Sequence, residues 1–370
     1  MAVPLLDLKA QHKSIREEVV SSMMKIVDDQ AFILGDSVKA FEADVAKYCN
    51  VRHAIGCANG TDAILLALRA LDVGHGDEVV TTPFTFFATA GAIHNVGAKP
   101  VFADIDPDTF NISPEAAGAA VTALTKAVIP VDLFGQMAAL ENVRAHVGNL
   151  PIVEDAAQSI GAKRKIDGKS VKAGEAATIG TFSFFPSKNL GGYGDGGMIV
   201  TQDDTLAMRL RRLRVHGGEK TYYHEEVGYN SRLDALQAAV LGAKLAHLEG
   251  WSAARRKNAE YYNKAFSDLS DVRIPTVEAA NESIYNQYTL RVNNRDGLQA
   301  HLKTAGIGNS VYYPLPLHLQ PCFAYLGYKQ GAFPESERAS AEVLSLPVYP
   351  ELTQSQLDEV IGAVRGFYGS

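Results

Sequence analysis

Short apolar runs alternate with helical segments along most of the chain. Apolar residues recur at helical spacing over 15–27, and apolar runs typical of buried strands follow at 100–103, 127–131 and 152–153. Strands separated by helices usually lie parallel, because each helix carries the chain back across the sheet. The pattern therefore predicts an α/β fold with a mainly parallel sheet.

The pattern changes in the last third of the chain. A helix over 233–248 leads into a second long helix, after which a strand at 288–292 and a short helix at 298–303 follow. A chain of 370 residues is long for one compact core, and 46% hydrophobic residues suffice for two. We expect a large domain over 1–245, which includes the N-terminal segment, and a small C-terminal α/β domain over 246–370.

Charge and cysteine content narrow the possible functions. The formal net charge of −7 argues against a general role on nucleic acids or membrane surfaces. A basic run at 209–214 is either a solvated helix face or a region that attracts a diphosphate substrate. The three cysteines lie far apart, and no segment approaches the ~18 apolar residues of a membrane helix, so we expect a cytoplasmic protein. The histidines lack metal-ligand spacing, which predicts no metal site.

Lys188 stands alone between an apolar strand and a glycine-rich loop, in the segment 180–197. A lysine becomes nucleophilic when partial burial or a neighbouring cation lowers its pKa, and a loop at a strand end lets it reach a carbonyl cofactor. The segment therefore suits a lysine that forms a Schiff base. An exposed loop lysine is the alternative interpretation.

Asp155 follows a short apolar strand in the segment 151–159. Ligands of open α/β sheets bind outside the carboxyl ends of the strands, so Asp155 and Lys188 are expected to lie together there. An aspartate at that place can pair with a protonated pyridine nitrogen and keep pyridoxal phosphate an effective electron sink. A helix N-cap is the alternative role for this carboxylate.

Gly60 and Thr61 precede a strongly helical stretch and are expected to cap its N-terminus. Free backbone amides and the positive end of the helix dipole make such a place a phosphate site, although many helices begin this way and bind nothing. Ser183, from an alternating strand with phenylalanines, could supply another hydroxyl to the same phosphate. It could equally be a small core residue.

These three segments, in this order, resemble a fold-type I pyridoxal-phosphate enzyme, and more closely the DegT/DnrJ/EryC1/StrS family of sugar aminotransferases. The resemblance extends over nearly the whole chain. It rests on seven motifs, at 4–11, 32–35, 58–63, 154–159, 185–188, 193–197 and 228–234. It implies an aspartate-aminotransferase-like large domain, a small C-terminal domain, and pyridoxal 5′-phosphate (PLP) as cofactor.

The resemblance also implies roles for individual residues at the cofactor. Lys188 would hold the cofactor aldehyde, Asp155 would pair with the pyridinium nitrogen, and Gln158 would hydrogen-bond the phenolic oxygen. Phe86 would stack on the ring, although a core aromatic is the alternative. The phosphate would be held by Gly60, Thr61 and Ser183.

Family members share their sites across a homodimer, so Asn230 would reach the cofactor phosphate of the partner subunit. Without the resemblance, the segment around Asn230 is an ordinary turn before a helix. By the same analogy, the residues that line the substrate site are Phe32, Ser187, Arg232, Tyr312 and Tyr313. Tyr312 stands where some relatives with uronic-acid substrates carry histidine, which argues against that substrate.

The implied reaction is transfer of an amino group from L-glutamate to a nucleotide-diphosphate keto sugar. The motifs favour carbon 3 of a UDP-linked 2-acetamido-3-keto sugar, for synthesis of cell-surface polysaccharide or lipopolysaccharide. A carbon-4 aminotransferase and a non-catalytic sensor or regulator are the alternatives. A sugar dehydratase is disfavoured, because those relatives carry histidine in place of the lysine at 188.

Overall fold

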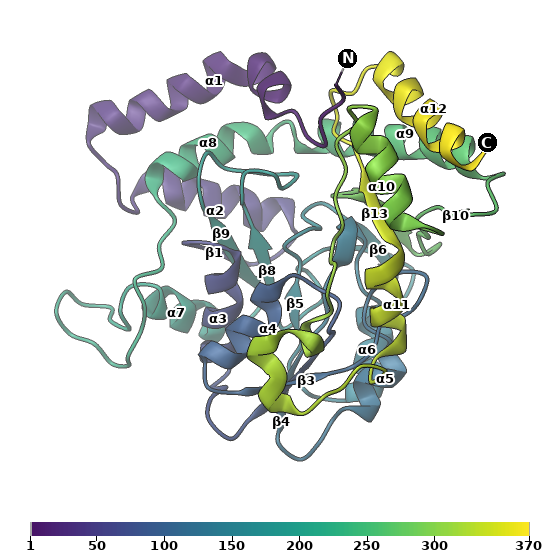
Figure 1. Cartoon of the computed structure of the whole chain (residues 1–370). Helices are drawn as coiled ribbons and strands as arrows, with labels where there is room; N and C mark the ends of the chain where they lie inside the picture. The colour runs from purple at the N-terminus through teal and green to yellow at the C-terminus, as the bar shows by residue number, and fades with distance from the viewer. Residues whose placement is uncertain (1, 370) are drawn as a thin grey trace.

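The computed structural model describes residues 2–369 and is built around one mixed β-sheet (Figure 1). A four-stranded ladder and a three-stranded ladder are joined by parallel bridges from Val128 to Ile152 and from Val131 to Asp155. The strands, in spatial order, are β1 (His53–Cys57), β9 (Gly197–Thr201), β8 (Ile179–Ser183), β5 (Val153–Asp155), β4 (Thr125–Ile129), β2 (Glu78–Thr81) and β3 (Lys99–Phe102). Only β9 runs antiparallel to its neighbours, so the predicted mainly parallel sheet is confirmed.

Helices cover both faces of this sheet. Successive residues of a strand point to opposite faces, so Ile199 packs with one helical layer while Met198 and Val200 pack with the other. The first layer contains α3 (Gly60–Ala70), α4 (Phe87–Asn95) and α7 (Asp204–Leu213). The second contains α2 (Asp36–Tyr48), α5 (Pro114–Ala119), α6 (Leu140–Val147) and α8 (Ala235–Leu245). The α/β class is therefore confirmed.

The last third of the chain has its own sheet and core. Strands β10 (Val272–Arg273), β12 (Tyr288–Val292) and β13 (Val343–Leu346) form an antiparallel sheet. Around it lie α9 (Leu248–Phe266), α10 (Arg295–Thr304), α11 (Pro334–Glu342) and α12 (Gln354–Tyr368). Val3 is fully buried in this core and bridges to Ile307, so the N-terminal segment contacts it as well. The division at residue 245 stays a prediction.

Helix α1 (Leu8–Asp29) packs along α8 on the outside of the large sheet (Figure 1). Its N-terminus is capped by Asp7, whose side chain accepts hydrogen bonds from the amides of Lys9 and Ala10, both at 3.0 Å. A small antiparallel sheet of β6 (Lys163–Ile166), β7 (Lys169–Lys172) and β11 (Asn281–Glu282) links the two main parts of the chain. Among residues 2–369, no helix is both long and apolar enough to cross a membrane.

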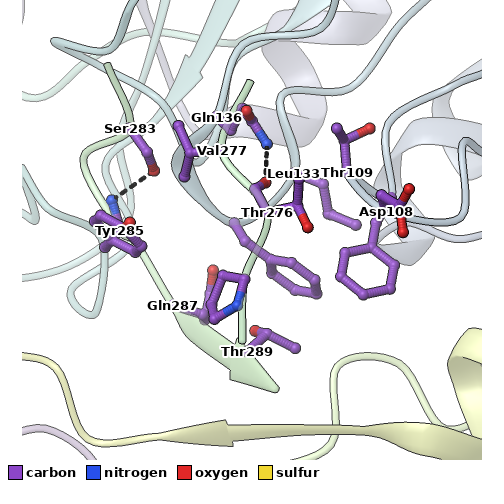
Figure 2. A pocket seen from close by; sticks show the side chains of 13 residues that line it. Asp108, Thr109, Leu133, Gln136, Thr276, Val277, Ser283, Tyr285, Gln287 and Thr289 are labelled. Atoms are coloured by element: carbon purple, nitrogen blue, oxygen red, sulfur yellow. Dashed lines mark hydrogen bonds between the residues drawn. The ribbon is translucent and has the colours of Figure 1, made fainter. Parts of the chain in front are cut away.

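The two main parts also meet beside a narrow crevice (Figure 2). Gln136 donates a hydrogen bond to the carbonyl of Thr276 at 3.0 Å, and the amide of Ile284 donates to the carbonyl of Gly135 at 3.0 Å. A Cβ on Gly135 would lie 2.7 Å from the amide nitrogen of Asn286, so only glycine permits this approach. The crevice holds about 20 Å³, enough for about one water molecule, which rules it out as a substrate site.

Candidate active site

Lys188 is returned to the sheet by a tight loop. β5 and β8 are parallel neighbours, with Asp155 opposite Thr181 in register, so both strands end at the same edge of the sheet. Two hydrogen bonds close the loop after β8. The amide of Lys188 donates to the carbonyl of Phe185 at 2.9 Å, and the amide of Gly192 donates to the carbonyl of Phe184 at 2.8 Å. This turn places the lysine over the end of β5, as expected from the sequence.

Burial around Lys188 changes its chemistry. The residue is half-buried, and desolvation of its ammonium lowers the pKa to about 8, against the opposing pull of the Asp155 carboxylate. The setting is not that of an exposed loop lysine, which would be hydrated and fully charged at neutral pH. The role of Lys188 at a cofactor stays a prediction.

Asp155 is buried at the end of β5 and faces Lys188. Its Oδ2 accepts a hydrogen bond from Thr89 Oγ1 at 2.7 Å, and its Oδ1 accepts one from the amide of Ala157 at 3.3 Å. Burial raises the pKa of this carboxyl, while the two hydrogen bonds and Lys188 lower it. A turn rather than a helix follows β5, so the alternative role as a helix N-cap is wrong.

The N-terminus of α3 meets the end of β8. A Cβ on Gly60 would lie 2.7 Å from Cβ of Ser183, so the absence of a side chain at Gly60 lets the two elements touch. The expected cap is corrected. Asn59 is the N-cap, because it precedes the first helical residue and its side-chain oxygen accepts from the amide of Asp62 at 2.9 Å, whereas Gly60 has no side chain to do so. Gly60 and Thr61 instead lie in the first turn, where backbone amides have no helical acceptor.

This junction fits a phosphate group. The positive end of the α3 dipole and the first-turn amides meet Ser183, and Thr61 belongs to the same first turn. Ser183 is half-buried rather than enclosed in the core, so its hydroxyl is available to a ligand. The residues present therefore fit the phosphate of PLP, and Lys188 and Asp155 fit its aldehyde and ring nitrogen.

Gln158 connects the large sheet to the C-terminal part of the chain. Its Oε1 accepts from the amide of Phe134 at 2.7 Å, and its Nε2 donates to the Tyr313 hydroxyl at 3.1 Å. The ring of Tyr313 lies 6.3 Å from that of Phe86, between centroids. Phe86 is 57% exposed, so it is not a core aromatic and its face is free for another ring. We predicted that the segment with Tyr312 and Tyr313 borders the site. Tyr313 does contact two of the predicted cofactor residues, Gln158 and Phe86.

Other predicted site residues are not gathered by this single chain. Ser187 is exposed beside Lys188. Phe32 and Arg232 lie on either side of an antiparallel bridge from Ile33 to Asp234, and Asn230 is exposed on the connection between α7 and α8. Within residues 2–369, no hydrogen bond or ion pair joins Phe32, Asn230 or Arg232 to Lys188 or Asp155. Their substrate and cofactor roles stay predictions.

Sequence reasoning missed the polar groups that surround Asp155. Thr89 is fully buried, and a hydroxyl in the otherwise apolar stretch 87–93 was the available signal. Glu154 and Asp132 are also buried, on either side of the backbone bridge between β4 and β5. Burial and the neighbouring Asp132 raise the pKa of Glu154 well above its ordinary value.

Residues 13–365 match the model of the DegT/DnrJ/EryC1/StrS aminotransferase family. The chain belongs to this family. Its members are PLP-dependent aminotransferases, so the expected enzyme class and cofactor are confirmed for the family to which the chain belongs. The family assignment agrees with the site described above, whose groups suit a carbonyl cofactor that carries a phosphate.

Three similar proteins cover essentially the whole chain. A pleiotropic regulatory protein of Geobacillus stearothermophilus is 52% identical over 100% of this chain and 99% of its own. The UDP-N-acetyl-3-dehydro-α-D-glucosamine 3-aminotransferase of Acidithiobacillus ferrooxidans is 44% identical over 98% and 97%. The crystal structure of S. venezuelae DesV in complex with a ketimine intermediate is 39% identical, with a TM-score of 0.97 over 100% and 99% of the two chains.

The contact between α3 and β8 gives a direct prediction. Gly60→Ala should weaken PLP binding at least about tenfold, because the new methyl group would force the helix N-terminus away from Ser183. Gly242→Ala in α8 is the control, since a Cβ there meets nothing within 4 Å. Fluorescence titration of cofactor-free protein with PLP measures both. Equal PLP affinity in Gly60→Ala and Gly242→Ala would show that the junction does not hold the phosphate.

Proposed function

We propose that this protein transfers an amino group from L-glutamate to carbon 3 of a UDP-linked 2-acetamido-3-keto sugar, supplying amino sugars for a cell-surface polysaccharide or lipopolysaccharide. The observation that carries the reaction type is the half-buried Lys188 facing the buried Asp155 beside a phosphate cradle. An amine with a lowered pKa, a carboxylate and a phosphate site together suit amine–carbonyl exchange.

Lys188 and the cofactor have separate roles in the proposed amino-group exchange. When bound, PLP supplies an aldehyde and an electron-withdrawing ring that stabilises negative charge on the substrate carbon. Lys188 would hold that aldehyde between turnovers and, once released, would move a proton to and from the reacting carbon. At a pKa of about 8, about a tenth of this amine is neutral at pH 7, against fewer than about one in a thousand for an ordinary lysine.

Asp155 would support the exchange by holding the positive charge of the ring nitrogen. Thr89 and the amide of Ala157 keep its carboxylate oriented. Gln158 is fixed by Phe134 and Tyr313, which leaves its amide at the edge of the same space. Phe86 offers an exposed aromatic face for stacking.

The substrate is supported by the similar proteins. The A. ferrooxidans relative is named for amino transfer at carbon 3 of a UDP-N-acetyl sugar, and it is 44% identical over nearly the full length of both chains. Tyr312 and Tyr313 add hydroxyls at the border of the site, where a sugar would lie. A carbon-4 aminotransferase is the competing assignment, because the same groups would serve it.

A regulatory function is the second candidate, and one observation favours it. The G. stearothermophilus relative, at 52% identity, is named as a pleiotropic regulatory protein. A purely regulatory protein needs no reactive amine, whereas burial here lowers the pKa of Lys188 from 10.5 to about 8. The intact pair of Lys188 and Asp155 therefore favours catalysis.

We also propose that the enzyme is a homodimer with shared sites. The connection between α7 and α8 projects from the body of the subunit (Figure 1). It carries Tyr222 at 90%, Tyr223 at 62% and Val227 at 85% exposure, and Asn230 is exposed at its base. Apolar side chains so exposed on one projection suit burial against another subunit. Asn230 would then reach the partner subunit's cofactor phosphate.

The substrate assignment is tested by running the reaction backward. With 2-oxoglutarate as acceptor, the enzyme should form glutamate from a UDP-linked 2-acetamido-3-amino sugar and at least about tenfold more slowly from its 4-amino isomer, because the reacting carbon must lie against Lys188. Coupled detection of glutamate measures both rates. Selective use of the 4-amino isomer would overturn carbon 3, and inactivity on every nucleotide amino sugar in PLP-loaded enzyme would favour the regulator.

Subunit mixing tests the shared site. Inactive Lys188→Ala and Asn230→Asp proteins, mixed one to one, should recover about a quarter of wild-type activity, because half of the dimers are mixed and each has one intact site. Lys188→Ala mixed with Asp155→Asn is the control and should recover none, since both residues belong to one chain's site. No recovery in the first mixture, with exchange confirmed by mass spectrometry, would contradict the shared site.

A further inference from the structure

Lys244 in α8 is a buried cation that the site described above does not use. Its side chain is 2% exposed. Burial lowers the pKa of its ammonium to about 8, and the charge of Glu351 opposes this change. Within residues 2–369, no carboxylate forms an ion pair or a hydrogen bond with Lys244. A buried ammonium without a carboxylate in contact destabilises a fold, which points to a role beyond stability.

The ammonium of Lys244 contacts the loop that carries Lys188. It donates a hydrogen bond to the carbonyl of Gly191, three residues after Lys188. It also lies 5.6 Å from the ring centre of Tyr193 and 5.8 Å from that of Trp251, within the range of cation–π attraction. A cation on a core helix thus bonds the backbone of this loop and attracts one of its side chains.

Gln237 holds the same loop from the same face of α8. It precedes Lys244 by seven residues, which is about two helical turns. Its Oε1 accepts a hydrogen bond from the amide of Tyr193 at 2.8 Å. A Cβ on Gly192 would lie 2.8 Å from Oε1 of Gln237, and one on Gly194 would lie 2.9 Å from its Nε2. The two glycines therefore let this side chain reach the backbone of the loop.

The loop depends on α8 because its other side is open. A cleft of about 620 Å³ lies between the loop 186–193 and the first turns of α1, so packing is sparse on that side. Toward the core, Leu190 is fully buried, and Asn189 donates a hydrogen bond to the carbonyl of Ile284 at 3.2 Å. These two contacts fix the first half of the loop, and the bonds from α8 fix the half beyond Leu190.

We propose that Lys244 and Gln237 are positioning residues, which hold the loop against α8 and so fix the amine of Lys188 over the end of β5; the inference rests on the proposed function. The Cα atoms of Gly191 and Lys188 are at most roughly 11 Å apart, so a displaced loop moves the amine with it. A misplacement of about 1 Å can slow a reaction about a hundredfold. The same displacement lets water reach the amine.

Labelling of Lys188 tests this position without turnover. In full-length cofactor-free protein exposed to trace acetic anhydride between about pH 6 and 11, acetylation of Lys188 follows its neutral amine. Gln237→Leu should raise the midpoint by about one pH unit from its value of about 8, because a loosened loop hydrates the ammonium. Lys257→Met, at an exposed lysine of α9, is the control and should leave the midpoint unchanged.

The neutral change at Gln237 decides the outcome. Lys244→Met should raise the midpoint as well, but it also removes a cation whose repulsion favours the neutral amine of Lys188. Gln237→Leu removes no charge, and Asp155, the charge that acts on Lys188, is untouched in each variant. Both variants should melt within about 5 °C of the wild type, because leucine and methionine favour helices. A wild-type midpoint in folded Gln237→Leu would overturn the inference, and Gln237→Ala replaces this variant if it does not fold.

Kinetics separate this inference from the proposed function. With a UDP-linked amino sugar and 2-oxoglutarate, Gln237→Leu and Lys244→Met should each lower kcat about tenfold and change KM less than about twofold, because their contacts fix the reacting amine rather than the sugar nucleotide. Wild-type kcat in both variants would overturn the positioning role alone. If no nucleotide sugar reacts with the wild-type enzyme, the proposed function fails, and the labelling midpoint of Gln237→Leu still decides this inference.

Discussion

One ammonium held against one buried carboxylate is the constraint on which the rest of the site depends. Desolvation of Lys188 favours its neutral form, and the charge of Asp155 favours its ammonium form. A carboxylate or an ammonium buried there without compensation would destabilise the fold, because burial of an unpaired charge is costly. Thr89 and the amide of Ala157 supply part of that compensation, and the parallel pairing of β5 with β8 brings the two side chains to one edge.

The contacts around this pair suit a phosphorylated aldehyde, as we propose. Gly60 allows α3 to touch Ser183, and we propose that a phosphate binds at this contact. Gln158 and Tyr313 join the large sheet to the C-terminal part of the chain across the same space.

The sequence predicted those features that depend on local pattern. Alternating apolar runs predicted the parallel strands, and the positions of Lys188, Asp155 and Gly60 at strand ends and a helix start, together with the family resemblance, predicted the site. The direction of β9 was not predicted, because an apolar run has the same pattern in either direction. Contacts such as Thr89 with Asp155, Gln158 with Tyr313 and His12 with Tyr193 join residues far apart in sequence, and no periodicity reports them. Roles that depend on a second subunit, as proposed for Asn230, lie beyond one chain's pattern.

Competitive labelling of Lys188 measures the central pair directly. Cofactor-free protein is exposed to trace acetic anhydride across pH 6 to 11, and acetylation of the Lys188 peptide, quantified by mass spectrometry, follows its neutral amine. The account predicts a midpoint at about 8 in the wild type and a lower one in Asp155→Asn, because the lost carboxylate charge no longer favours the ammonium form. A wild-type midpoint near the ordinary lysine value of 10.5, or a midpoint that rises in Asp155→Asn, would contradict it.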